Sequence, residues 1–201
     1  MRPVLDFLLM HEGQQVDREI ALQRRDWEDL AQIDAIESIL SDFSRQFGSG
    51  HLEEFFASAA DEMGELKQLV ARVGFAEPFD AALDFGCGLG RLTRAMKSFC
   101  REVVGVDISE EMVRQAQLLN PNCQFVHNPY NDLRVFSSGR FDLVYSFQVL
   151  QHQRSAALIR NYVSEFIRVL KPGGLALFQV PYRISFLHRL QPRRRMFQIL
   201  S

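Results

Sequence analysis

The stretch that decides the fold is Ala82-Leu83-Asp84-Phe85-Gly86-Cys87-Gly88-Leu89-Gly90-Arg91-Leu92-Thr93. A short apolar run ends at a carboxylate, passes through three alternate glycines and enters a segment with helical spacing, which predicts a strand, a tight loop and a helix. Glycines suit a loop whose backbone approaches a ligand, because they have no Cβ and adopt positive φ. The N–H groups at the start of the following helix favour an anionic ligand group. The pattern therefore predicts a nucleotide-type binding turn.

Two acids indicate which cofactor this turn suits. A dinucleotide fingerprint places a third glycine or alanine at the position of Arg91, which weakens the nicotinamide interpretation. Asp84 would repel a pyrophosphate but would attract an ammonium group, such as the one on the methionine end of S-adenosylmethionine. A second apolar run, residues 101–107, ends at Asp107, where a carboxylate can accept hydrogen bonds from both ribose hydroxyls. The two acids are expected to hold opposite ends of one cofactor.

Four segments then follow one another along the chain: Leu83–Gly90, Val104–Ser109, Phe141–Ser146 and Arg168–Gly174. In order and spacing they resemble the successive motifs of class I S-adenosylmethionine-dependent methyltransferases. The resemblance covers residues 79–182 and implies the cofactor and the reaction type, but not the acceptor.

The resemblance also implies site roles for the matching residues. The residues expected to bind S-adenosylmethionine are Asp84, Gly86, Cys87, Gly88, Gly90, Asp107, Ile108, Asn128 and Ser146. Among these, Asn128 matches a position whose side chain hydrogen-bonds the adenine amino group, and Ile108 would pack on the adenine.

Candidate catalytic and acceptor residues lie after the fourth predicted strand, after the last one, and in the N-terminal appendage. Gln148 and His152 follow the fourth predicted strand, and ligands of open α/β sheets bind beyond the carboxyl ends of the strands. His152 is a candidate general base, and the alternative is a residue that only caps its loop by hydrogen bonding. Tyr182 and Trp27 are candidate acceptor contacts, although a lone tryptophan on an apolar helix face also fits a core position.

The alternation of strand and helix patterns predicts an α/β fold, a Rossmann-like doubly wound and mainly parallel sheet with an N-terminal helical extension. The predicted strands are residues 81–85, 102–107, 123–126, 141–146 and 175–180. The predicted helices are residues 51–73, 90–99, a segment capped by Ser109, and 156–170. Lys171-Pro172-Gly173-Gly174 is expected to end the last helix and to turn into the last strand.

Three regions are expected: a helical appendage or lid at 1–50, an S-adenosylmethionine-binding domain at 51–182, and a basic tail at 183–201. The apolar face of the appendage should bury against the main domain, with a second subunit or a lid over the substrate as alternatives. Family members normally continue into an antiparallel hairpin, for which the tail has too little room, so this hairpin is predicted to be absent or truncated. The last strand would then be an edge that a partner, for example in a homodimer, covers.

Composition and charge limit the class of protein. The apolar fraction of 47% and the charged fraction of 24% are ordinary for a globular protein. The net charge of −2 argues against nucleic acid as a partner, although the basic tail could hold nucleic acid, an acidic lipid or an anionic substrate. The three cysteines lack metal-type spacing, so no metal site is expected, and their odd number without a secretory signal favours free thiols. No apolar run approaches the ~20 residues that a membrane span requires.

Together these features predict a cytoplasmic S-adenosylmethionine-dependent methyltransferase. It would transfer a methyl group to a small-molecule, lipid-linked or sugar-linked acceptor by in-line displacement and leave S-adenosylhomocysteine. Two alternatives stay open: a non-catalytic scaffold that binds the same cofactor, and a Rossmann-type enzyme that uses a nicotinamide. The acceptor atom is not fixed by the sequence, because oxygen, nitrogen and carbon methylation share this fold.

Overall fold

The computed structural model describes residues 2–39 and 52–180, and its centre is one sheet of five parallel strands. The strands are β1 (Phe79–Phe85), β2 (Cys100–Asp107), β3 (Gln124–His127), β4 (Phe141–Ser146) and β5 (Leu170–Phe178). Their order across the sheet is β3-β2-β1-β4-β5, so the chain winds outward from β1 and then returns to its other side. This reversal beside β1 is the point at which doubly wound sheets bind ligands. The predicted α/β fold is confirmed.

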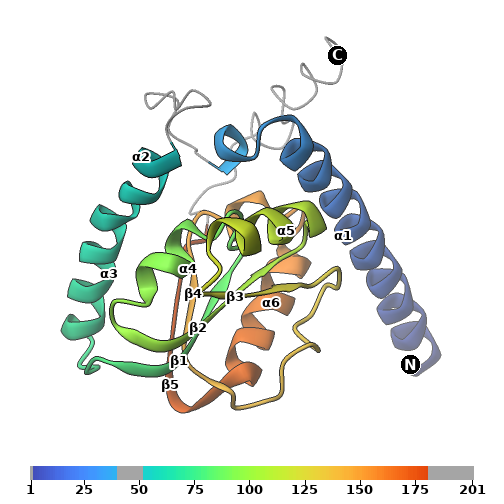
Figure 1. Cartoon of the computed structure of the whole chain (residues 1–201). Coiled ribbons are helices and arrows are strands. Elements are labelled where there is room, and N and C mark those ends of the chain that lie inside the picture. The colour runs from blue at the N-terminus through green and yellow to red at the C-terminus, as the bar shows by residue number, and fades with distance from the viewer. Residues whose placement is uncertain (1, 40–51, 181–201) are drawn as a thin grey trace.

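Helices cover both faces of the sheet (Figure 1). On one face, α3 (Ala59–Arg72) and α4 (Arg91–Met96) pack against Ala82 and Leu143. On the other face, α6 (Ala156–Val169) packs against Leu83 and Val144. Since both faces of the sheet are covered, β1 is buried along almost its whole length instead of alternating between buried and exposed residues. The helix α5 (Glu110–Leu119) follows β2, and its Val113 and Ala116 pack against Phe125 of β3.

The N-terminal helix α1 (Arg2–Ile39) runs along one side of the domain, as the blue helix of Figure 1 shows. Ile20 joins the core beneath α6, and Ala31 and Ala35 pack with Phe55 and Met112. The predicted helical appendage is therefore a helix as far as Ile39, with its apolar face on the main domain. The division into three regions stays a prediction.

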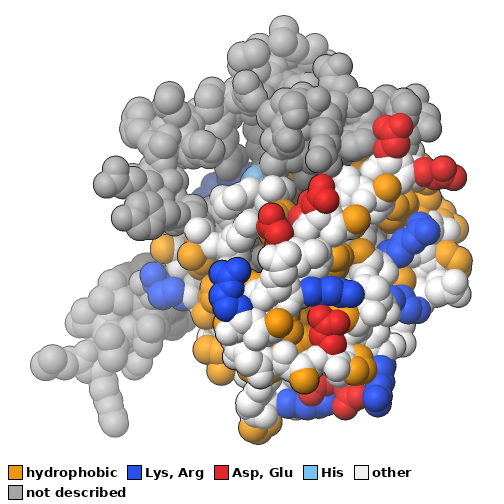
Figure 2. Space-filling model, turned by 90° about the vertical axis from the view of Figure 1, so that its left-hand side faces the viewer, with side chains coloured by type: hydrophobic (Ala, Val, Ile, Leu, Met, Phe, Trp, Pro, Cys, Tyr) orange, Lys and Arg blue, Asp and Glu red, His pale blue; other side chains and the backbone are white. Residues whose placement is uncertain are grey.

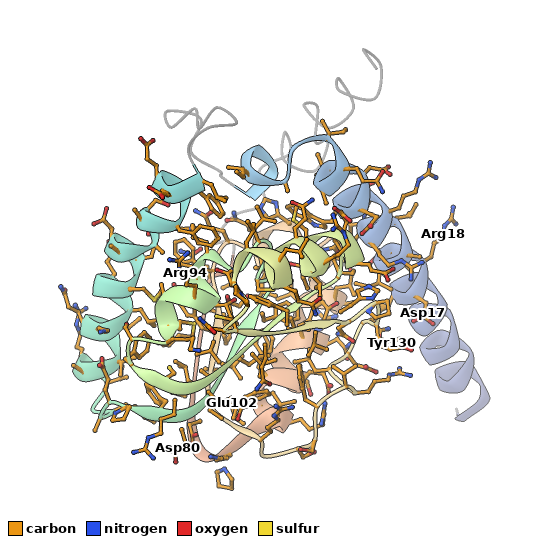
Figure 3. The ribbon with its side chains drawn as sticks, in the orientation of Figure 1. Asp17, Arg18, Asp80, Arg94, Glu102 and Tyr130 are labelled. Atoms are coloured by element: carbon orange, nitrogen blue, oxygen red, sulfur yellow. The ribbon has the colours of Figure 1, made fainter. Side chains whose placement is uncertain are left out.

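Carboxylates of α1 dock it on the amino ends of two other helices. Glu28 accepts a hydrogen bond from the Oγ of Ser109 at 2.7 Å, and Glu19 accepts one from the Oγ of Ser155 at 2.5 Å. These serines are the N-caps of α5 and α6. A carboxylate suits this place because the amino end of a helix carries partial positive charge. Closer to the amino end of α1, Asp17 accepts a hydrogen bond from Asn131 at 2.9 Å, on the side where Figure 3 places Tyr130.

The single helix predicted for residues 51–73 is wrong. The segment forms α2 (Leu52–Ala57) and α3, and Ser58 separates them. The Oγ of Ser58 donates to the carbonyl of Phe55 at 2.7 Å, the kind of local hydrogen bond by which serine competes with helix formation. Gly74, directly after this segment, has φ +84°, the left-handed conformation in which glycine commonly follows the end of a helix.

The turn predicted at Lys171–Gly174 is also wrong. β5 begins at Leu170, directly after α6, and these four residues lie within the strand. Leu170 pairs with Phe141 and Leu175 pairs with Leu143, so the extra residues of β5 form a bulge. Glycine accommodates this irregular backbone, because Gly173 has φ +81°.

Other boundaries shift by a few residues. β1 and β2 each begin two residues before the predicted start, and α4 ends at Met96 instead of residue 99. The amides of Lys97, Ser98 and Phe99 donate to carbonyls three residues back, so the α-helix tightens into a turn there.

Among the described strands, β5 lies at one edge of the sheet. The predicted tail at 183–201, with Tyr182 before it, lies outside the described residues. The absent hairpin and the homodimer across this edge therefore stay predictions. Within the two described ranges no helix is long and apolar enough to cross a membrane. On the face that Figure 2 shows, basic and acidic side chains are interspersed over the described surface.

Candidate functional site

A pocket opens at the carboxyl ends of β1, β2 and β4, with about 990 Å³ of empty space when its open mouth is included. The glycine loop, the ends of β2 and β3, the loop after β4 and helix α1 all contribute to it. Its lining residues are Gln23, Trp27, Asp84, Phe85, Gly86, Cys87, Gly88, Arg91, Leu92, Val106, Asp107, Ile108, Met112, Asn128, Phe147, Gln148, Val149, His152, Gln153 and Tyr162. Among the predicted site residues that the structure describes, all except Gly90 and Ser146 line this pocket. Tyr182 lies outside the described residues.

The glycine loop needs its glycines for two different reasons. Gly86 has φ +76°, and a Cβ there would lie 2.4 Å from Cγ2 of Val149, so a side chain would strain the backbone and press into the loop after β4. Gly90 has φ +80°, but its Cβ would meet the ring of Phe125 at 2.5 Å. Gly90 does not line the pocket, and glycine is required there for packing against β3. Its predicted cofactor contact stays a prediction beside this structural role.

Asp107 is held in place by backbone donors at the end of β2. Its Oδ2 accepts a hydrogen bond from the amide of Gly88 at 2.9 Å, and its Oδ1 accepts one from the amide of Ser109 at 3.0 Å. Burial raises the pKa of the Asp107 carboxyl, and these hydrogen bonds oppose the rise. Each oxygen keeps a further lone pair, so the carboxylate can still accept two hydroxyl donors.

Asp84 is the most deeply buried acid of the pocket, with 2% of its surface exposed. Its Oδ2 accepts a hydrogen bond from Oγ1 of Thr93 at 2.6 Å. Burial raises the pKa of Asp84 to about 6, and Thr93 and the Arg91 guanidinium oppose this rise. A cationic ligand group beside Asp84 would favour the ionised form.

Asn128, directly after β3, has an unused acceptor atom. Its Nδ2 donates to the carbonyl of Asp132 at 2.6 Å, and its backbone amide donates to the carbonyl of Asp107 at 2.9 Å. The side chain is only 4% exposed, and its Oδ1 has no hydrogen-bond partner among the described residues. A buried carbonyl without a partner is costly, so this atom suits a ligand N–H donor.

The loop after β4 carries a strained residue. Gln148 has φ +58°, a left-handed conformation that is uncommon outside glycine and that is often found at ligand sites. Its backbone amide donates to Oε1 of Gln179 at 3.1 Å, which ties the loop to the segment after β5. Ser146, just before this loop, is almost fully buried and does not line the pocket.

His152 and Trp27 meet across the mouth of the pocket. His152 lies in the short 3₁₀-helix η1 (Leu150–His152), and its ring lies edge-on to the Trp27 ring with centroids 5.6 Å apart. Trp27 is half-buried at the pocket rather than enclosed in the core. Both the general-base and the loop-capping interpretations of His152 stay predictions.

Sequence reasoning missed two buried glutamines of the pocket. Gln23 and Gln153 are 3% and 9% exposed, and Oε1 of each has no partner among the described residues. Gln23 could have been noticed, because it lies at helical spacing between Ile20 and Trp27 on the buried face of α1, where a polar residue is unusual. Gln153 follows η1 in a loop and carries no local signal.

Comparisons with known proteins point to one family. Residues 83–178 match the family described as methyltransferase domain. A relative named "Probable S-adenosylmethionine-dependent methyltransferase" from Mycolicibacterium smegmatis is 34% identical over 104 residues, which cover 52% of this chain and 39% of the relative. The ubiquinone biosynthesis O-methyltransferase of Psychrobacter arcticus is 30% identical over 140 residues, which cover 67% of this chain and 50% of that enzyme.

Solved structures agree in fold. The PH0226 protein from Pyrococcus horikoshii superposes with a TM-score of 0.50 and 28% identity, over 59% of this chain and 56% of that one. This chain spans half or less of the length of the two curated relatives described above. The similarity therefore concerns the domain built around the glycine loop.

Proposed function

Because this chain carries a class I S-adenosylmethionine-dependent methyltransferase domain, we propose that it binds S-adenosylmethionine and transfers the methyl group to a small-molecule acceptor. The observation that supports this proposal most directly is the pocket itself. It gathers residues of the glycine loop, the acid that ends β2 and the amide directly after β3 at the ligand-binding edge of the sheet. The cytoplasm remains the predicted compartment.

The residues present fit this cofactor. The positive φ of Gly86 and Gly88 lets the loop turn without side chains at the place where a ligand would approach. Asp84 provides a buried carboxylate for the ammonium group, and Asp107 provides a positioned carboxylate for the ribose hydroxyls. The unpartnered Oδ1 of Asn128 can accept the hydrogen bond of the adenine amino group.

The sulfonium group of S-adenosylmethionine supplies an activated methyl group when bound. The protein's contribution is then mainly to orient the acceptor and to exclude water. Gln148 and His152 stand at the end of β4, on the side of the pocket away from Asn128's strand, and they are the candidate groups beside the acceptor. His152 can take a proton from the acceptor if its ring faces the nucleophile.

Isothermal calorimetry with S-adenosylmethionine and S-adenosylhomocysteine tests the cofactor assignment. We expect micromolar binding, and we expect Asp107→Ala to weaken it at least about tenfold because the ribose loses its acceptor. Unchanged affinity in this variant would remove the ribose assignment. Stronger binding of a nicotinamide dinucleotide would favour the alternative Rossmann-type enzyme.

Turnover is tested separately by following S-adenosylhomocysteine formation with candidate acceptors. Cofactor binding without turnover on any acceptor would favour the scaffold alternative. No binding of either cofactor form would contradict the proposal itself.

A further inference from the structure

The cofactor assignment leaves part of the pocket unused, which we call the acceptor half, and α1 forms one wall of it. The residues of this part are Gln23, Trp27, Phe147, Gln148, His152 and Gln153. It adjoins the end of β4, where the acceptor must approach the methyl group if the proposed function holds.

Gln23 and Gln153, which the proposed function does not use, each bring a buried polar side chain to the pocket. Gln23 reaches the pocket from α1 and Gln153 reaches it from the loop after η1. Both side chains are more than nine-tenths buried, and neither Oε1 has a partner within the described part of the chain. A buried polar atom without a partner is unfavourable, so such a pair indicates that a ligand completes the hydrogen bonding.

The charge of this half of the pocket limits the ligand. Among the described residues that line it there is no aspartate, glutamate, lysine or arginine. The acids Asp84 and Asp107 belong to the cofactor half, and Arg91 is paired with Glu62 at 3.0 Å. An ionised acceptor group would enter a site where no described side chain carries the opposite charge, which is unfavourable away from water.

We infer that Gln23 and Gln153 form the acceptor site, and that it takes a neutral molecule bearing hydroxyl groups; this inference rests on the proposed function. A primary amide both accepts and donates hydrogen bonds, which matches a hydroxyl group. Trp27 and Phe147 supply apolar contact for the rest of the acceptor. Specificity thus comes from α1 and from the loop after η1, both outside the glycine-loop motifs.

The test measures binding to the full chain loaded with S-adenosylhomocysteine. Three probes share one dihydroxylated ring and differ in charge: hydroxytyrosol is neutral, homoprotocatechuate is anionic and dopamine is cationic. Calorimetry should show that hydroxytyrosol binds at least about tenfold more tightly than either charged probe.

Variants that introduce a negative charge distinguish hydrogen-bond recognition of the acceptor from simple packing against it. Gln23→Glu and Gln153→Glu keep the size of the side chain, and each should raise the affinity for dopamine relative to hydroxytyrosol by about tenfold. Gln32→Glu, on the exposed face of α1, is the matched control and should leave the order of the probes unchanged. The affinity for S-adenosylhomocysteine should stay within about twofold in all three variants.

The inference is overturned if hydroxytyrosol does not bind, if a charged probe binds more tightly to the wild-type chain, or if the glutamate variants leave the probe order unchanged. It is also overturned if these variants weaken S-adenosylhomocysteine as much as the probes, because the glutamines would then belong to the cofactor half. Failure of the wild-type chain to bind S-adenosylhomocysteine would instead contradict the proposed function.

Discussion

At the scale of single residues, Asp84 couples the pocket to pH. An acid whose pKa is raised by folding, here from 3.8 to about 6, takes up protons on folding. Its contribution to stability is therefore full below the unfolded pKa and is lost as pH rises through about 6. We expect the ligand-free wild-type chain to lose about 3 kcal/mol of stability relative to Asp84→Asn over this range. Urea unfolding of both proteins at a series of pH values measures this stability difference. Parallel pH profiles of the two proteins would contradict the expected loss.

The same residue gives cofactor binding the opposite pH dependence. An ammonium group attracts Asp84 only when the carboxyl is ionised, so affinity for S-adenosylhomocysteine should increase as pH rises to about 6 and then level off. Asp84→Asn should bind more weakly, with a smaller dependence on pH. Burial also raises the pKa of Asp107, so any slope that remains in this variant reports on Asp107. Calorimetry at matched ionic strength separates the contributions of Asp84 and Asp107. Equal slopes of affinity against pH in the wild-type and Asp84→Asn chains would contradict the role of Asp84.

Gly86 and Gly139 form a matched pair for the glycine loop. Both have positive φ, but a Cβ on Gly139 would meet no atom within 4 Å, whereas one on Gly86 would collide with Val149. Gly139→Ala should therefore cost about 1 kcal/mol of backbone strain, and Gly86→Ala should cost roughly 1–3 kcal/mol more. Val149→Ala should recover part of the extra cost. Thermal unfolding measures these differences, and equal losses in both alanine variants would show that the contact with Val149 is unimportant.

At the scale of elements, α1 is held by its carboxylates on the capped ends of α5 and α6. Glu28 also accepts from the amide of Glu111 at 3.3 Å, and Gln23 lies between the two docking points. Glu19→Ala and Glu28→Ala should each destabilise docking by about 1 kcal/mol, so trypsin should cleave the exposed Arg24–Arg25 segment several-fold faster.

Asp29→Asn is the control for this docking experiment. Asp29 faces solvent and pairs with Arg25 at 3.9 Å, a type of contact that contributes little. Its cleavage rate should equal that of the wild-type chain. Equal rates in all variants would indicate that apolar packing alone holds α1 in place. Slower cleavage in the presence of S-adenosylhomocysteine would link α1 to the cofactor pocket.

The elements also show what local sequence can predict. β4 was predicted with its observed bounds and the Ser109 cap at its observed place, because an apolar strand and a serine before two glutamates are local signals. The break at Ser58 was missed because the apolar spacing runs through it. The bulge in β5 was missed because Gly173 is as compatible with a turn as with an irregular strand. Its register is set by pairing with β4, a neighbour distant in sequence.

At the scale of the whole molecule, the two halves of the pocket were not equally predictable. Asp84, Asp107 and Asn128 each lie at or next to the carboxyl end of a parallel strand, so the fold class brings them together at that end of the sheet. Their convergence follows from the order of motifs along the chain. Gln23 and Gln153 reach the pocket only because α1 docks across it and η1 turns toward it, and such docking depends on packing that no local motif encodes.

The glycine loop and the helix layer beside it are joined by one buried ion pair. Arg91, the residue after Gly90, pairs with Glu62 of α3 at 3.0 Å and also donates to Oγ of Ser58 at 3.2 Å. Its side chain is 8% exposed and that of Glu62 is 23% exposed. Removing one partner of such a pair leaves a buried charge without compensation, which is costly.

Glu62→Gln should therefore lower the free energy of unfolding by about 2–3 kcal/mol, somewhat less than for a fully buried pair because water still reaches Glu62. The control is Asp80→Asn, which breaks the pair between Asp80 and Arg101 at the amino ends of β1 and β2, far from the pocket, where Figure 3 places Asp80. Those side chains are 65% and 72% exposed, so the loss should stay below about 0.5 kcal/mol.

Arg91→Met combined with Glu62→Leu should cost less than the sum of the single changes, because neither charge is then left alone. Urea unfolding of these variants measures the coupling between Arg91 and Glu62. Additive losses for Arg91→Met and Glu62→Leu would show that α3 and the glycine loop are stabilised independently. Equal losses for Glu62→Gln and Asp80→Asn would lead to the same conclusion.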